Sequence, residues 1–143
     1  LVIRQAGLDD VPAIVALLAE DPLGSSREEP GPPLPDAYLH AFAAIAADPN
    51  QFLAVAEIGG EVVGTLQLTF IPGLSRLGRW RGQIEAVRVA GGHRGSGLGG
   101  RLLTWAIDTC RERGCRLVQL TSDKSRAHAH RFYERLGFAA THE

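Results

Sequence analysis

The chain has 143 residues, of which 45% are hydrophobic and 22% charged, and its formal net charge is -1. This length and composition predict a single soluble domain over 1–143 and exclude a second domain of typical size. A near-neutral charge without a long basic block gives no general attraction to nucleic acid or to an anionic membrane, so we expect neither as a partner. The apolar stretches are too short to span a bilayer and the first residues do not resemble a secretion signal, which predicts a cytoplasmic location.

The first 50 residues predict a short strand and two helices. Residues 2–5 form the predicted strand, and apolar residues at helical spacing over 11–18 predict a helix that ends near Asp21. The stretch 22–35 holds five prolines and several charges, so we expect a mobile surface loop there. A second helix is predicted over 36–48, with its apolar residues on one face.

Beyond residue 50 the sequence predicts a β-hairpin followed by alternating strands and helices. The predicted elements are strands at 52–58, 62–71, 83–89 and 116–121, helices from Leu98 to Gly114 and over 127–136, and an extended piece from Phe138. The hairpin is antiparallel, whereas the strands joined by the helix after Leu98 should be parallel with a right-handed crossover. The predicted fold class is therefore α/β with a mixed sheet, in the order β-α-α-β-β-β-α-β-α-β.

Two cysteines and two neighbouring histidines are the residues that a metal or redox site would use. Cys110 and Cys115 are five residues apart, which fits neither a Cys-x-x-Cys pair nor a disulfide framework, so we interpret both as structural thiols. His128 and His130 are two apart on a predicted helix and therefore point in different directions. We expect no metal site.

A glycine-rich turn, Arg94-Gly95-Ser96-Gly97-Leu98-Gly99-Gly100, stands between a predicted strand and a predicted helix. Glycine lets the backbone approach a ligand closely, and the free N–H groups of a helix N-terminus attract anions. The turn therefore predicts a pyrophosphate site, although a flexible connection without a ligand is an alternative.

The same turn also satisfies the dinucleotide fingerprint Gly-x-Gly-x-x-Gly, with Asp123 about twenty residues farther on. A dinucleotide turn, however, directly follows the first strand of its domain. Here residues 90–94 intervene and the turn lies late in the chain, which argues against that alternative.

The turn and a second motif together resemble the GNAT superfamily of acetyl-CoA-dependent N-acetyltransferases. Arg94-Gly95-Ser96-Gly97-Leu98-Gly99 matches the family's Gln/Arg-x-x-Gly-x-Gly/Ala motif, and Tyr133-Glu134-Arg135-Leu136-Gly137-Phe138 matches its Tyr-Glu-x-x-Gly-Phe signature. The element order agrees over essentially the whole chain. The resemblance implies a GNAT-like fold with acetyl-CoA as co-substrate. It also implies acetyl transfer to a primary amine of a small molecule or a peptide, by direct attack in a ternary complex.

The resemblance also assigns cofactor-binding residues. The strand before the turn would offer the backbone of Val87, Arg88 and Val89 to the pantetheine arm of acetyl-CoA. The pyrophosphate would be held at the turn, by Arg94 and by backbone N–H groups of Gly95, Ser96, Gly97, Leu98, Gly99 and Gly100. The family often has Asn seven residues before the Tyr, where this chain has Arg126, so that contact is open; Arg126 could instead reach a cofactor phosphate or the acceptor.

Acetyl transfer requires a proton acceptor for the amine and a proton donor for the departing thiolate. Tyr133 resembles the family's general acid, with a core aromatic as the alternative. For the base we favour Glu85, because similar proteins carry a carboxylate on this strand. Strand alternation places Glu85 on the same side as Val87 and Val89; a solvent-facing Glu85 is the alternative.

The sequence leaves three points open: the activity, the acceptor and the oligomeric state. A non-catalytic acyl-CoA-binding or sensing domain would keep the same turn, and so would a dinucleotide-binding module. The acceptor cannot be named, because its expected walls, the segments 22–35 and 76–81, carry no recognisable specificity code. The family often forms dimers, so a homodimer is an expected partner.

Overall fold

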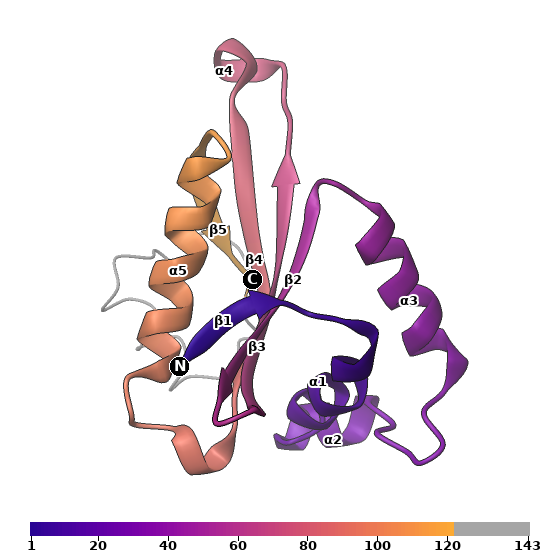
Figure 1. Cartoon of the computed structure of the whole chain (residues 1–143). Helices are drawn as coiled ribbons and strands as arrows, with labels where there is room; N and C mark the ends of the chain where they lie inside the picture. The colour runs from indigo at the N-terminus through magenta and orange to yellow at the C-terminus, as the bar shows by residue number, and fades with distance from the viewer. Residues whose placement is uncertain (122–143) are drawn as a thin grey trace.

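The computed structural model describes residues 1–121, which form a five-stranded sheet in the order β1-β2-β3-β4-β5 (Figure 1). The strands are β1 (Val2–Gln5), β2 (Gln51–Ile58), β3 (Glu61–Ile71), β4 (Trp80–Val89) and β5 (Cys115–Leu120). The first three neighbouring pairs are antiparallel, and β4 and β5 are parallel. The mixed α/β sheet expected from the sequence is therefore confirmed.

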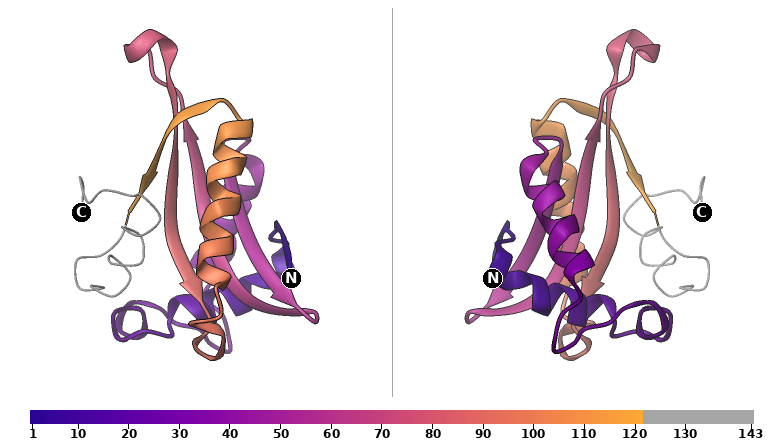
Figure 2. Two further views of the ribbon diagram at one scale, coloured as in Figure 1. Left: turned by 90° about the vertical axis from the view of Figure 1, so that its left-hand side faces the viewer. Right: turned by 90° about the vertical axis from the view of Figure 1, so that its right-hand side faces the viewer.

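Helices cover both faces of this sheet. They are η1 (Leu8–Asp10, a 3-10 turn), α1 (Val11–Leu18), α2 (Pro22–Arg27), α3 (Asp36–Ala47), α4 (Ser75–Gly78), η2 (Gly91–His93, also 3-10) and α5 (Leu98–Glu112). Helix α5 connects β4 to β5 along one face, whereas α1 and α3 lie on the opposite face (Figures 1 and 2). None of the helices within 1–121 is long and apolar enough to cross a bilayer.

The predicted hairpin is confirmed as β2 and β3. Its two connecting residues are Gly59 and Gly60, with φ angles of 60° and 82°. A two-residue hairpin whose central residues both have positive φ has the twist that its strands require, and only glycine, asparagine and aspartate adopt it readily. This local signal is why the sequence located the hairpin.

The face under α5 is closely packed. Leu102, Leu103, Ala106 and Cys110 of α5 have no exposed surface. They cover β-strand residues that are equally buried, and the Phe52 ring of β2 lies 5.4 Å from the Trp105 ring, centroid to centroid. Burial raises the pKa of the Cys110 thiol to about 12, which fits the structural role expected of it.

Two segments differ from the sequence-based expectation. Residues 22–27, expected as part of a loop, form helix α2, because the Asp21 carboxylate accepts a hydrogen bond from the Gly24 N–H at 2.6 Å and Pro22 occupies the first turn. The first helix does end shortly before Asp21, as predicted, but the Asp-Pro pair also begins a second helix that was not predicted. Strand β4 begins at Trp80, three residues earlier than expected. The predicted helix over 127–136 and the piece from Phe138 lie outside the described residues.

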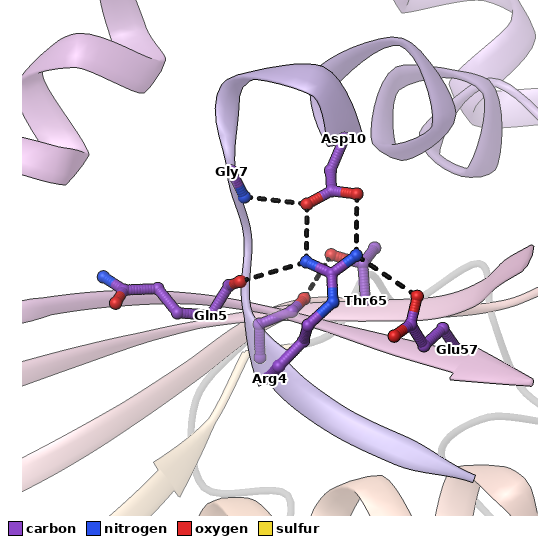
Figure 3. Close-up of polar contacts among 7 residues, drawn as sticks. Arg4, Gln5, Gly7, Asp10, Glu57 and Thr65 are labelled. Atoms are coloured by element: carbon purple, nitrogen blue, oxygen red, sulfur yellow. Dashed lines mark hydrogen bonds and ion pairs between the residues drawn. The ribbon is translucent and has the colours of Figure 1, made fainter. Parts of the chain in front are cut away.

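The start of α1 is attached to the sheet by a polar network around Arg4 (Figure 3). The Arg4 guanidinium donates to both oxygens of Asp10, at 2.7 and 3.0 Å, and to Glu57 of β2 at 3.3 Å. Asp10 also accepts the Gly7 N–H at 2.7 Å. A single arginine of β1 thus joins the 3-10 turn before α1 to the neighbouring strand.

Candidate functional site

Strand β4 contains a bulge at Ala86. Glu85 is paired with Gln67 of β3, but the next pair along the two strands is Arg88 with Thr65, so β4 has one residue more than β3 in this stretch. Ala86 has a φ angle of 54°, which is unusual for a residue with a side chain. An extra residue of this kind bends the strand and redirects the side chains that follow.

The bulge overturns the expected orientation of Glu85. Directly paired residues in an antiparallel sheet point to the same face, so Glu85 shares a face with Gln67, which borders the space beneath α1 and α3. Val87 and Val89 instead pack against the core beneath α5. Simple alternation placed all three on one side, and it failed because the bulge inserts a residue between them.

Beyond the bulge, β4 and β5 part. The last paired residues are Ile84 of β4 and Leu120 of β5, whereas β4 continues to Val89 (Figure 2). Within residues 1–121, no strand pairs with this edge of β4 after Ile84. Among residues 1–121, the backbone of residues 85–89 therefore has no strand partner on this edge, although the Val87 carbonyl accepts from Arg88 Nη1 at 2.9 Å and the Val89 carbonyl from Arg94 Nε at 3.3 Å. A strand edge of this kind can bond an extended, amide-containing ligand as another strand would.

The glycine turn follows directly and ends at the N-terminus of α5. Gly95 and Gly97 have φ angles of 81° and 84°, and Gly97 is the residue that caps α5. A side chain would be strained at either position, although no atom stands within 4 Å of the added carbon. The described backbone bonds do not use the N–H groups of Leu98, Gly99 and Gly100, so they suit an anion.

Arg94 and Arg88, both expected to bind the cofactor, make ion pairs with the junction between α1 and α2. Arg94 lies 3.5 Å from the Glu20 carboxylate, which also accepts the Gly91 N–H at 2.6 Å. Arg88 lies 4.0 Å from the Asp21 carboxylate. The end of α1 is thereby joined to the segment that leads into the glycine turn.

A pocket of about 170 Å³ lies between α1, α3 and the sheet. Its lining includes Gln67 of β3 and Ala86 at the bulge, so it reaches the part of β4 that carries Glu85. Most of the remaining lining is apolar and comes from α1 and α3. The sequence did not indicate this pocket, because its walls come from segments that are distant in the chain.

The structure thus places Glu85, the edge of residues 85–89 that has no strand partner within residues 1–121, and the turn 94–100 along one end of β4. Tyr133 and Arg126 lie outside the described residues, so their roles stay predictions. Among residues 1–121, no three His, Cys, Asp or Glu side chains are grouped to hold a metal ion. Gln67 was missed by the sequence reasoning, because only the strand register shows that it is paired with Glu85.

Comparison with known proteins extends this description. A model of the acetyltransferase (GNAT) family matches residues 13–138. The chain is 32% identical to an aminoalkylphosphonate N-acetyltransferase of Salmonella typhimurium, over 98% of this chain and 86% of the relative.

Solved structures resemble the whole chain. A protein of Bacillus halodurans C-125, named as a transcriptional regulator, is 50% identical with a TM-score of 0.95, covering 99% of this chain and 95% of that one. An acetyltransferase of Trypanosoma brucei is 30% identical with a TM-score of 0.77, covering 99% of this chain and 94% of that one. The family match, which runs to residue 138, includes the sequence of the glycine turn and Tyr133.

Proposed function

Because the chain belongs to the acetyltransferase (GNAT) family and is an acetyl-CoA-dependent N-acyltransferase, we propose that it acetylates a primary amine of a small molecule. The reaction proceeds by direct attack of the amine while both substrates are bound. A small molecule is preferred to a peptide because a relative that matches nearly the whole chain is named for acetylation of an aminoalkylphosphonate.

The bulge at Ala86 is the observation that carries this proposal. Because of the bulge, the Glu85 carboxylate points toward α1 and α3. The residues after Glu85 present a backbone edge that has no strand partner within residues 1–121. The helix N-terminus after Gly97 lies a few residues farther along. An extended thioester can therefore lie along the edge with its pyrophosphate at the turn, while the amine approaches from the α1 and α3 face.

Each group then has a defined chemical task. The N–H groups of Leu98, Gly99 and Gly100 bind the pyrophosphate, supported by the charge of Arg94. The backbone of Val87 and its neighbours orients the acyl-bearing arm. Only a neutral amine can attack a carbonyl carbon, so Glu85 accepts the amine proton, directly or through a water. Tyr133 donates a proton to the departing thiolate. This chemistry requires no metal.

Thiol release from acetyl-CoA in the presence of a panel of primary amines tests the proposal. We expect release that depends on the amine and gives an acetylated product identified by mass spectrometry. Glu85→Gln should lower kcat by about 100-fold or more and leave the KM for acetyl-CoA unchanged. Glu61→Gln, at the exposed first residue of β3, is the matched control. Full turnover of Glu85→Gln at every pH would remove Glu85 from the mechanism.

A non-catalytic acyl-CoA-binding or sensing domain is the alternative function. It is favoured by one observation, the name of the half-identical Bacillus halodurans protein as a transcriptional regulator. A sensing domain would bind acetyl-CoA saturably and release no thiol with any amine. The proposed homodimer and the cytoplasmic location are tested separately, by sedimentation and by cell fractionation.

A further inference from the structure

The pocket beneath α1 and α3 differs from the rest of the site in its chemistry. Val11, Ile14, Phe42 and Leu53 supply apolar side chains to its lining. Binding of an apolar ligand group in such a pocket is favourable, because apolar surface is removed from water. Binding of an anion is unfavourable, because the lining does not replace the hydrogen bonds that the anion makes with water. The pocket therefore selects by shape and apolar contact.

The polar side chains in the lining are already paired within the protein. The Thr65 hydroxyl donates to the Ala54 carbonyl at 2.8 Å, and the Gln67 amide donates to Gln51 at 2.8 Å. The Tyr38 hydroxyl donates to the Glu28 carboxylate at 2.8 Å and accepts the Glu29 N–H at 2.9 Å. A ligand group that forms hydrogen bonds would compete with these bonds, whereas an apolar ligand group would leave them in place.

The volume of the pocket suits a group of definite size. An engineered cavity of about 150 Å³ lined by aliphatic and aromatic side chains binds benzene, and this pocket measures about 170 Å³. A phenyl ring or a branched alkyl group of similar size therefore fits. A long polyamine would leave its second ammonium among apolar side chains, which is costly.

Helix α3 shows that the space beneath it is incompletely filled. Tyr38, Phe42 and Ile45 face the pocket at helical spacing, yet no residue of α3 is fully buried. By contrast, five residues of α5 are buried against the other face of the sheet. An apolar helix face that the protein leaves half covered is available as one wall of a ligand pocket.

The charge of the segment that includes α1 and α3 favours binding of a cation on the pocket side of the sheet. Residues 8–48, which include α1, α2 and α3, carry eight carboxylates and a single arginine, Arg27. Three of the carboxylates are paired with arginines of β1, β4 and the glycine turn, so the other five supply most of the excess negative charge. Among the lining residues that the structure describes, none is Lys, Arg or His. The field of this segment attracts an amine in its ammonium form and repels a phosphate or phosphonate.

We propose that this pocket holds the apolar body of the acceptor, and that the acceptor class is a primary amine carrying one aryl or branched alkyl group without a phosphate or phosphonate. The inference rests on the proposed function. The amino group then lies at the part of the pocket lined by Ala86 and Gln67, which are next to Glu85 in the chain and in the strand pairing. This chain would thereby differ in acceptor from its aminoalkylphosphonate-acetylating relative.

An acceptor panel tests the class directly. We expect kcat/KM for 2-phenylethylamine and isopentylamine to exceed that for aminomethylphosphonate and spermidine by on the order of 100-fold. A preference for aminomethylphosphonate or spermidine would overturn the inference while leaving acetyl transfer established.

A substitution that fills the pocket tests whether the amine binds there. Ala41→Phe adds a ring at a residue of α3 that lines the pocket, and Ala43→Phe makes the same change at a residue outside the lining; both alanines are exposed. Ala41→Phe should raise the KM for 2-phenylethylamine by about tenfold or more without changing the KM for acetyl-CoA. Ala43→Phe should change neither. Equal effects of the two variants would show that the amine binds elsewhere.

Calorimetric titration of the amines separates failure of the inference from failure of the proposed function. If 2-phenylethylamine binds the original protein but not Ala41→Phe, and no amine releases thiol, the pocket assignment stands and the proposed catalysis fails. If thiol is released with other amines and 2-phenylethylamine neither binds nor reacts, acetyl transfer stands and the pocket assignment fails.

Discussion

The two faces of the sheet are held together in different ways. Under α5 the contact is dense: Leu102 and Cys110 are fully buried, and a Cβ added to Gly82 would lie 2.4 Å from the Cys110 Sγ. On the opposite face α3 has no fully buried residue, and a pocket of about 170 Å³ remains beneath it. One face is built for stability, and the other leaves room for a ligand.

The looser face is instead attached by polar contacts at the two ends of the α1 segment. Arg4 is paired with Asp10 at its beginning, and Glu20 binds the Gly91 N–H at its end. Such contacts position a helix without filling the space beneath it. The comparison suggests that substitutions under α5 affect mainly stability, whereas those under α1 and α3 affect mainly acceptor binding.

The largest expected effect is on the dense face. Leu102→Ala should lower the free energy of unfolding by about 3 kcal/mol, because a fully buried side chain leaves a cavity. Phe42→Ala, a larger truncation beside the pocket, should cost only about 1.5 kcal/mol, since Phe42 is half-buried. Urea unfolding of both variants measures this. Equal losses would mean that the two faces are equally packed.

A second test adds volume rather than removing it. Gly82→Ala should cost about 2 kcal/mol, because its Cβ would meet Cys110 Sγ at 2.4 Å. Gly92→Ala is the matched control, as an added Cβ there meets no atom within 4 Å. Adding Cys110→Ala to Gly82→Ala should recover part of the loss in urea unfolding. No recovery would show that the close approach is not the cause.

The attachment at Asp10 should be sensitive to pH. Hydrogen bonding to Arg4 lowers the pKa of Asp10 below its usual 3.8, so the stabilisation is complete above about pH 4 and is lost as pH falls through the lowered value. Asp10→Asn should lower Tm by a few degrees at pH 7. The difference from the original protein should shrink below pH 4 in a thermal melt; a constant difference would mean that the charge is irrelevant.

The smallest effect is expected where the looser face meets the glycine turn. Glu20→Gln keeps an oxygen for the Gly91 N–H but releases Arg94 from its ion pair. The KM for acetyl-CoA should fall by about twofold at low salt, and the difference should disappear at high salt. Glu112→Gln on the exposed end of α5 is the control. A raised KM would show that the pair positions Arg94 for binding.

Local signals explain what could be predicted. The Gly59-Gly60 hairpin and the apolar repeat of α5 each depend on neighbouring residues, and both were found. The end of the first helix near Asp21-Pro22 was also found, but the helix that begins at this pair was missed, because the same residues are common at helix beginnings and near helix ends. Glu85 was found on the correct strand but assigned to the wrong side.

By itself, the sequence determined the order of the strands within residues 1–121 and the glycine turn that begins α5, because a helix N-terminus with glycines at 95 and 97 is specified by a few adjacent residues. Anion binding at that turn stays a prediction. The tertiary structure decided which face Glu85 occupies and what surrounds it. That outcome depends on the register between β3 and β4 and on the bulge at Ala86, which only the pairing of distant strands reveals. The pocket has the same origin, since its walls come from α1, α3 and three strands.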